Sequence, residues 1–250
     1  TSDVEAPDEG YGDKADHVLV RYYQKANALM EEDPSAAEGV AELLRRNEAL
    51  DRDSIESVRA SCRRVLDGMM ESLHRLGIGV DRFVWESDSL LDGSVEEVVG
   101  LLRARPESQE EDGSCFIDME PFGISGKNTR WAFTRSDGTS LYTTRDVAYH
   151  RWKLARCDRA VNVLGEDHRL QARQLAVALE LTGVPPGRIP EVVFLSFVSL
   201  PEGKMSTRRN RVVFLDQLLD EAVERAAAEV KARRPELGAG EAAAIAEAVG

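Results

Sequence analysis

The chain of 250 residues is 42% hydrophobic, which is enough to form a globular core in one large domain or two ordinary ones. Its formal net charge of -13 argues against binding of nucleic acid or anionic lipid through bulk charge, so we expect no membrane and no DNA partner, and any polyanion must be held by a local basic group. An adaptation to a salty cytoplasm is the alternative explanation of the acidity.

Three helices are predicted in the first eighty residues. In residues 15–30 the apolar side chains recur at intervals of three and four, which is the period of one buried helical face. A second helix is expected over residues 35–50, and a third over residues 53–76, opened by the capping pair Asp53 and Glu56. The N-terminal third of the chain is therefore expected to be helical.

A short mixed segment follows, in which the pattern changes from helical to β-like. A helix is expected from Ser94, with Glu97 as its capping partner, and it ends before Pro106. The stretches CFIDM (residues 115–119) and RWAFTR (residues 130–135) have the composition of short strands between polar turns. We expect a small mixed α/β segment here.

Farther along the chain, apolar strands alternate with helices. The expected elements are, in order, a strand at SLYTT (residues 140–144), a helix ending at residue 154, a strand at AVNVLG (160–165), a helix over residues 170–181 and a strand at VVFLSF (192–197). Strands that are apolar throughout and alternate with helices indicate parallel βαβ units. From Asp216 the chain returns to helix.

A basic loop, EGKMSTRRNR, lies between the apolar runs VVFLSFVSL and VVFLDQLL. Four positive charges fall within eight positions of this acidic chain, on Lys204, Arg208, Arg209 and Arg211. In open α/β sheets ligands bind beyond the carboxyl ends of the strands, so an ammonium group and neighbouring hydroxyls in such a loop can hold a polyphosphate. The alternative is a solvated surface loop, but the clustering of charge favours an anion site.

Two other strand ends carry polar candidates. Tyr142 and Asp146 lie four positions apart and would face the same side of a helix that begins at Thr143. The alternatives are an edge-of-core aromatic residue and a first-turn acid favoured by the helix dipole. After AVNVLG, Gly165 ends the strand where close approach of a nucleotide would require a missing side chain, and His168 is either a ligand contact or a capping or core histidine.

Five stretches together resemble one family. GKMSTR is similar to the signature loop of class I aminoacyl-tRNA synthetases, in the form used by arginyl-tRNA synthetases. DGTSLYTTRDVAYHRWK resembles the arginine-pocket segment of that family, and VNVLGEDHRLQARQL resembles the strand and turn that follow it. FVWESDSL and VVFLDQLLDEA also match, and the matches run in order from about residue 11 to residue 228.

The resemblance implies a role for each candidate residue. The basic loop would neutralise the triphosphate of ATP as pyrophosphate leaves, and a carboxylate would match the donors of the arginine guanidinium group. The catalytic group that it implies is Lys204, Ser206, Thr207 and Arg208. The substrate-binding group is Tyr142, Asp146 and Asp167, and the ATP-binding group is Gly165, His168 and Lys204.

The partners implied by the resemblance are arginine, ATP and the acceptor end of a tRNA. Mg²⁺ is expected only with ATP, since no cluster of metal ligands is recognisable in the sequence, and His17 and His150 are assigned to helices without a metal role. Cys62, Cys115 and Cys157 form no CxxC pair, and the acidic N-terminus is unlike a signal peptide. We therefore expect a cytoplasmic protein with neither a disulfide framework nor a zinc site.

By the same resemblance the fold class is α/β. It comprises the second half of a Rossmann-like parallel sheet, a mostly helical N-terminal part and a small mixed α/β insertion, followed by helices. The expected domains are the helical part of the catalytic region (residues 1–85), the mixed insertion (86–138), the second half of the nucleotide-binding fold with the signature loop (139–215) and the start of the following helical region (216–250).

The sequence also departs from the family. It contains no His-x-Gly-His element and no counterpart of the N-terminal appended or anticodon-binding domains, so we expect a central piece of the catalytic core that does not activate arginine alone. Glu166 replaces a small residue, and Arg209-Asn210 replaces Lys-Gly, with roles left open. The competing hypotheses are a class I synthetase of another amino-acid specificity and a non-catalytic paralogue or fragment that binds tRNA or a partner protein.

Overall fold

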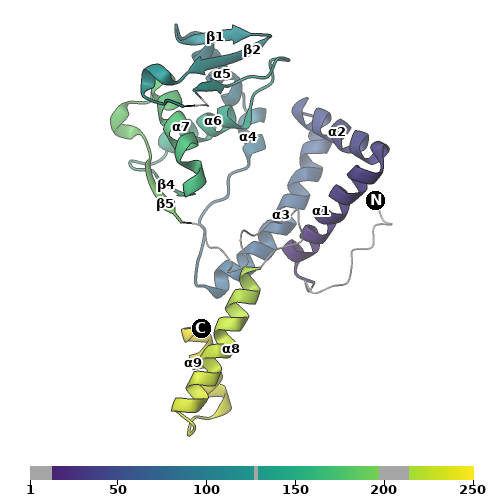
Figure 1. The fold of residues 1–250 in the computed structure, drawn as a ribbon, viewed down its shortest axis with the longest axis vertical. Coiled ribbons are helices and arrows are strands. Elements are labelled where there is room, and N and C mark those ends of the chain that lie inside the picture. Colours follow the sequence, from purple (N-terminus) through teal and green to yellow (C-terminus); the bar gives the residue numbers. More distant parts are fainter. Residues whose placement is uncertain (1–12, 127–128, 197–213) are drawn as a thin grey trace. The chain divides into compact units, whose positions relative to one another are not determined.

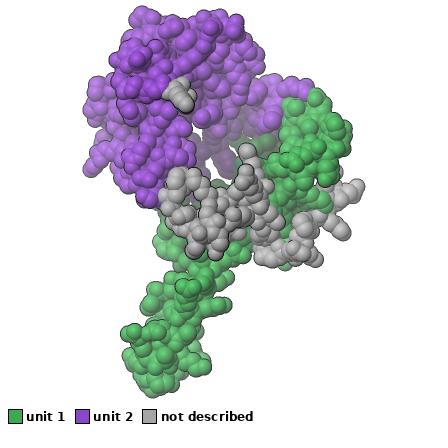
Figure 2. All heavy atoms as spheres, viewed as in Figure 1, with its two compact units in different colours: residues 1–43, 56–81, 199–250 green, residues 44–55, 82–198 purple. Residues whose placement is uncertain are grey.

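The computed structural model describes residues 13–126, 129–196 and 214–250 (Figure 1). By their internal contacts the residues form two compact units, which are coloured separately in Figure 2. Unit 1 comprises residues 1–43, 56–81 and 199–250, and unit 2 comprises residues 44–55 and 82–198. This division by contact differs from the four segments expected from the sequence, which group residues by role.

Unit 1 is built from helices. Its helices, two of which extend by a few residues into unit 2, are α1 (Ala15–Glu32), α2 (Pro34–Glu48), α3 (Arg52–Arg75), α8 (Leu215–Arg233) and α9 (Ala239–Val249). The first three confirm the helices predicted from the apolar period. α1 and α3 approach closely at Gly68, where an added Cβ would lie 2.7 Å from the backbone nitrogen of Asp16. A side chain at residue 68 would therefore push the two helices apart.

The predicted caps of two helices are wrong. Asp51 caps α3, since its Oδ1 accepts a hydrogen bond from the backbone nitrogen of Ser54 at 2.8 Å, whereas Asp53 is already inside the helix. The capping residue thus lies two positions before the predicted one. Glu97 does not cap its helix either, because its carboxylate accepts a hydrogen bond from Arg151 at 3.0 Å.

Unit 2 begins with a small antiparallel sheet and two helices. The elements are α4 (Glu86–Leu91), α5 (Ser94–Arg103), β1 (Ser108–Glu111), β2 (Ser114–Asp118), the short 3-10 helix η1 (Glu120–Phe122) and β3 (Arg130–Ala132). The strands lie in the order β1-β2-β3, and all pairs are antiparallel. The strands predicted at CFIDM and RWAFTR are confirmed, while α4 and β1 were not foreseen. β1 and β2 are joined by a tight Asp-Gly turn in which both residues have positive φ.

The strand predicted at SLYTT is wrong, because most of it is the first turn of a helix. α6 spans Tyr142–Leu154; before it, Leu141 is extended and Ser140 forms an isolated antiparallel bridge with Thr134. The buried Thr144 hydroxyl donates a hydrogen bond to the carbonyl oxygen of Phe133 at 2.6 Å, which ties this turn to the chain that follows β3. Two β-branched threonines favoured a strand locally, and this tertiary contact overrides that preference.

A parallel βαβ unit completes unit 2. β4 (Val161–Gly165) pairs in parallel with β5 (Glu191–Leu195), and the connection contains η2 (Glu166–His168), α7 (Arg169–Leu181) and η3 (Pro186–Arg188). The predicted parallel pairing is confirmed over these two strands. In the described part of the chain this parallel sheet has two strands, so the observed architecture is a helix-rich α/β fold with two small sheets.

The core of unit 2 lies among the antiparallel sheet, α5, α6 and α7. Its fully buried members include Leu102, Ile117, Phe133, Val147 and Leu179. These side chains hold one face of α6 rigidly, because close-packed interiors resist displacement. The outward face of α6 is left to carry polar residues.

Two further predictions concern membranes and cysteines. None of the helices formed by the described residues is both long and apolar enough to cross a membrane. Cys62, Cys115 and Cys157 are all free thiols.

Candidate active site

A pocket of about 540 Å³ opens in unit 2 beside the outward face of α6. One wall comes from the chain between Arg82 and Ser94, which includes α4. The other wall consists of residues at helical spacing on α6, namely Tyr142, Arg145, Asp146, Tyr149 and Trp152. Such a concave site with aromatic walls and a few convergent polar groups has the character of a small-molecule site.

The lining of this pocket carries more negative than positive charge. Its acids are Glu86, Asp88, Asp92 and Asp146, and its bases are Arg82 and Arg145. Arg145 is already engaged, because it donates to the Glu86 carboxylate at 2.9 Å. A cationic ligand would therefore be favoured over an anionic one.

Tyr142 and Asp146 lie together in this pocket, as their spacing predicted. α6 begins at Tyr142, one residue before the expected start, and the interval of four residues keeps both side chains on one face. Tyr142 is 68% exposed, and the side chain of Asp146 is 50% exposed. Both can therefore reach a ligand.

The Asp146 side chain contacts a buried histidine, His150, which the sequence assigned only to a helix. The Nδ1 atom of the buried His150 lies 3.0 Å from Oδ1 of Asp146 and 2.8 Å from its backbone oxygen. The Nε2 atom of His150 lies 2.9 Å from Nδ2 of Asn162 on β4, and Oδ1 of Asn162 accepts a hydrogen bond from Lys153 at 2.6 Å. Only the i,i+4 spacing of Asp146 and His150 was visible in the sequence.

The turn after β4 brings Gly165, Asp167 and His168 together, outside the residues that line the pocket. Asp167 and His168 are exposed in η2, and their carboxylate oxygen and ring nitrogen are 3.8 Å apart. An added Cβ on Gly165 would lie 2.7 Å from Oδ1 of Asp167, so the missing side chain lets this carboxylate fold back over the strand end. Glu166, whose role was open, pairs with Arg169 at 3.0 Å.

The signature-loop candidates lie outside the described residues. They are Lys204, Ser206, Thr207 and Arg208, together with Arg209 and Asn210. The described chain on either side ends after β5 and resumes at α8. Their proposed roles therefore stay predictions from the sequence.

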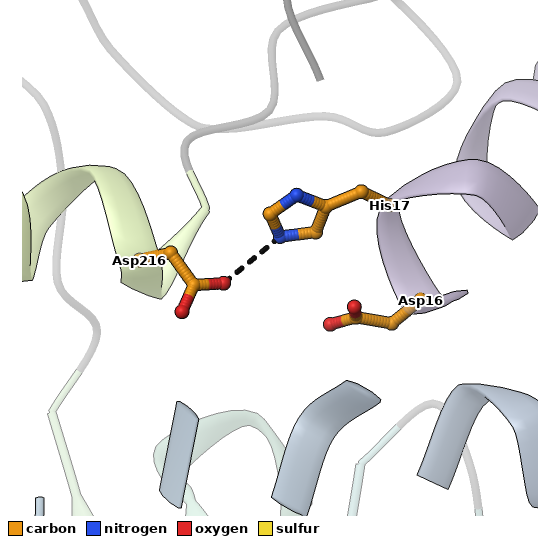
Figure 3. Close-up of side chains that lie close together, drawn as sticks. All are labelled: Asp16, His17 and Asp216. Carbon is orange, nitrogen blue, oxygen red and sulfur yellow. Dashed lines mark ion pairs between the residues drawn. The ribbon is translucent and has the colours of Figure 1, made fainter. Parts of the chain in front are cut away.

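A second polar cluster lies in unit 1, where α1, α3 and α8 meet. Figure 3 shows Asp16, His17 and Asp216, the only group of three metal-ligand side chains found among the described residues, with His17 directed at Asp216. Nε2 of His17 is 2.9 Å from Oδ2 of Asp216, and the Lys14 ammonium is 2.6 Å from the same oxygen. The Ser72 hydroxyl donates to Oδ1 of Asp216 at 2.9 Å.

The cation of this second cluster is Lys14, since a metal ion bound to Oδ2 of Asp216 would have to displace its ammonium group. Burial opposes ionisation of Asp216, but hydrogen bonds from Lys14 and Ser72 outweigh it and lower the pKa of the carboxyl group. Burial likewise opposes the charge on Lys14, but the hydrogen bonds and negative charges of Asp216 and Asp16 outweigh burial and raise the pKa of the amine. The cluster is thus an ion pair that joins three helices.

Comparison with known proteins places the chain in a family. Residues 7–250 match the model of "tRNA synthetases class I (R), catalytic domain". An arginine–tRNA ligase of Methanocella arvoryzae is 46% identical over 238 residues, which cover 95% of this chain and 41% of that protein. An arginine–tRNA ligase of Halorubrum lacusprofundi is 46% identical over 225 residues, which cover 88% of this chain and 37% of that protein. The chain thus spans about 40% of the length of the curated relatives it matches.

Solved structures show the same fold at lower identity. The Thermus thermophilus arginyl-tRNA synthetase superposes with a TM-score of 0.64 at 21% identity, covering 91% of this chain and 47% of that one. The Plasmodium falciparum arginyl-tRNA synthetase superposes with a TM-score of 0.66 at 15% identity, covering 95% of this chain and 41% of that one. Because residues 7–250, nearly the whole of this chain, match the family model, the chain belongs to the family of class I tRNA synthetase (R) catalytic domains.

Proposed function

We propose that this chain is part of the catalytic core of an arginine–tRNA ligase, which activates arginine with ATP and transfers it to the 3′ end of its tRNA. The observation that carries the proposal is the acidic, aromatic pocket in which Tyr142 and Asp146 share one wall. The names of the relatives agree with a guanidinium ligand. Membership of the family supports ATP as the other substrate.

In the proposed reaction the pocket binds the side chain of arginine. The planar guanidinium group presents paired N–H donors, which match the two oxygens of the Asp146 carboxylate. The phenol of Tyr142, one helical turn away, offers an acceptor and an aromatic face. The remaining acids of the wall add a field that favours a cation over a neutral amino acid.

Activation joins the arginine carboxylate to the α-phosphorus of ATP and releases pyrophosphate. Positioning and charge placement supply most of the acceleration for such a transfer. We assign Lys204 to the triphosphate charge and Ser206, Thr207 and Arg208 to the shape of the loop. Gly165 and His168 are assigned to contacts with ATP, and Asp167 to contacts with the amino-acid substrate. Mg²⁺ would arrive with ATP.

The remaining expectations from the sequence belong to the same proposal. The parallel β4-β5 pair would be part of a Rossmann-like sheet, and residues 139–215 would form the second half of the nucleotide-binding fold. Residues 1–85, 86–138 and 216–250 would be the helical part, the mixed insertion and the following helices. The whole enzyme would act in the cytoplasm, and the chain alone would not catalyse arginine-dependent exchange of pyrophosphate into ATP.

Calorimetric titration of the chain with L-arginine tests the binding step. Citrulline, in which a neutral ureido group replaces the guanidinium, is the matched ligand control. We expect arginine to bind and citrulline to bind much more weakly. Asp146→Asn should weaken arginine binding by roughly tenfold, the loss of about one charge-assisted hydrogen bond, whereas Asp158→Asn, at an exposed position outside the pocket, should leave it unchanged.

Three outcomes would contradict the proposal. Equal binding of arginine and citrulline would show that the guanidinium charge is not recognised. Unchanged affinity in the Asp146→Asn variant would remove that carboxylate from the site. Tighter binding of cysteine or glutamate than of arginine would instead support a class I synthetase of another specificity.

A further inference from the structure

A chain of polar contacts leads from β4 to the pocket carboxylate. Lys153 on α6 donates to Oδ1 of Asn162 on β4, at 2.6 Å. The amide nitrogen of Asn162 is 2.9 Å from Nε2 of His150, and Nδ1 of His150 is 3.0 Å from Oδ1 of Asp146. His150 is only 5% exposed. A buried imidazole with a polar partner at each nitrogen is poorly explained as a simple filler of the core.

The proton position on this imidazole follows from its neighbours. An ammonium group has donors and no lone pair, so Lys153 must face the oxygen of the Asn162 side chain. The NH₂ group of Asn162 then faces Nε2 of His150, which must accept and therefore carries no proton. The proton of the neutral ring lies on Nδ1, where both neighbouring atoms, the carboxylate and backbone oxygens of Asp146, are acceptors.

We propose that His150 is a positioning residue, which is fixed as the Nδ1–H tautomer by Asn162 and Lys153 and which orients the Asp146 carboxylate for its ligand. Its Nδ1–H donates to the backbone oxygen of Asp146 at 2.8 Å and also faces Oδ1 at 3.0 Å. This contact restrains Oδ1 and leaves the other acceptor positions of the carboxylate directed toward the pocket. The identity of that ligand as a guanidinium group rests on the proposed function. The tautomer and its contact with Asp146 stand independently of it.

Asp146 gains two properties from this arrangement. A carboxylate that is half exposed would otherwise sample several rotamers, and fixing it in advance lowers the entropy lost when a ligand binds. Because the histidine is neutral, it orients the carboxylate without cancelling its charge. A positively charged partner in the same place would compete with a cationic ligand.

The first experiment reads the tautomer directly, in the unaltered chain. Long-range ¹H–¹⁵N correlation spectra distinguish Nδ1–H, Nε2–H and doubly protonated imidazole. At neutral pH we expect the Nδ1–H form for His150. In the Asn162→Asp variant an acceptor replaces the NH₂ group, and we expect His150 to be protonated on both nitrogens. An Nε2–H ring in the unaltered chain, or an unaltered protonation state in the variant, would overturn the proposal.

The second experiment separates positioning from packing with two amide substitutions of His150. The amide nitrogen of His150→Asn can lie near the Nδ1 position and donate to Asp146. The amide of His150→Gln reaches the Nε2 position, so it can contact Asn162 but supplies no donor to Asp146. We expect His150→Asn to retain most of the affinity for L-arginine and His150→Gln to lose roughly 3- to 10-fold. Thermal unfolding of both variants is the control for their folding.

Equal losses in the two variants would show that the ring acts only through packing and would overturn the positioning role. A failure of the unaltered chain to bind arginine, with the Nδ1–H tautomer observed, would instead reject the proposed function. The two failures are therefore distinguishable.

Discussion

The Asp216→Asn substitution tests the ion pair that joins three helices of unit 1. The Asp216 side chain is 22% exposed and contacts Lys14, His17 and Ser72. Substitution removes the charge but keeps the shape, and it leaves the Lys14 ammonium without its closest counter-ion. Breaking a fully buried pair from one side costs about 3–5 kcal/mol. Because Lys14 keeps Asp16 at 3.4 Å and some solvent, we expect a loss of about 2 kcal/mol.

The pH dependence of this loss has a definite sign. The folded pKa of Asp216 is lowered below its ordinary value of 3.8, so its contribution to the free energy of unfolding is complete above that value and disappears as the pH falls through the folded pKa. The folded pKa of Lys14 is raised above 10.5, so its contribution is complete below that value and disappears only as the pH rises through the raised pKa. The stability difference between unaltered chain and variant should be constant near neutrality and vanish in acid.

Hydrogen exchange measured by mass spectrometry is the suitable assay, because it reports on α1, α3 and α8 separately from unit 2. Peptides from these helices should exchange faster in Asp216→Asn at pH 7, and peptides from α5 to α7 should not change. Asp220→Asn is the matched control. Asp220 lies on α8, as Asp216 does, and pairs with Arg75 of α3, but its side chain is 64% exposed and its loss should cost much less. An equal effect of both substitutions, or a difference that persists in strong acid, would refute the reasoning.

Two further predictions concern the stability of unit 2, and thermal unfolding measures both. Gly113→Ala should lower the free energy of unfolding by about 2–3 kcal/mol, because Gly113 has a φ of 78° and its added Cβ would press on the backbone carbonyl of Ser136. Gly187→Ala is the control; it has open space around the added Cβ and should be nearly neutral. Thr144→Val should lower the free energy of unfolding by about 1–2 kcal/mol, because it removes the buried hydrogen bond to Phe133 while keeping the shape of the side chain. The same substitution at the partly exposed Thr143 is the matched control. Neutral Gly113→Ala or Thr144→Val variants would contradict these assignments.

The elements that were predicted correctly are those whose signal is local. The apolar period of α1 to α3 is a property of consecutive residues, and it survives in the structure. SLYTT failed because the buried hydrogen bond of Thr144 to Phe133, eleven residues away, decides its conformation. The apolar content of β4 and β5 predicted strands, and their alternation with α7 predicted the parallel pairing.

The candidate site was predictable only in part, for the same reason. Tyr142 and Asp146 were found through their spacing and the family resemblance, and the pocket brings them together. The role of His150 depends on Asn162, which reaches it from a different element. Asp216 lies about 200 residues from His17 in sequence, so no spacing rule could have connected them.

Asp146 and Asp216 each lie beside a buried histidine, but their carboxylates differ in how many acceptor positions remain open. An ionised carboxylate has about four acceptor positions. Asp216 accepts hydrogen bonds from Lys14 and Ser72 and lies 2.9 Å from Nε2 of His17. The lysine balances its charge, so this carboxylate serves to hold helices together. Among the described contacts the Asp146 carboxylate has one close side-chain neighbour, Nδ1 of His150 at 3.0 Å, and its side chain is half exposed in an acidic pocket. Open acceptor positions and a carboxylate that is not directly paired with a Lys or Arg side chain among the described residues are what a cationic ligand requires, and they make Asp146 the carboxylate that can recognise one.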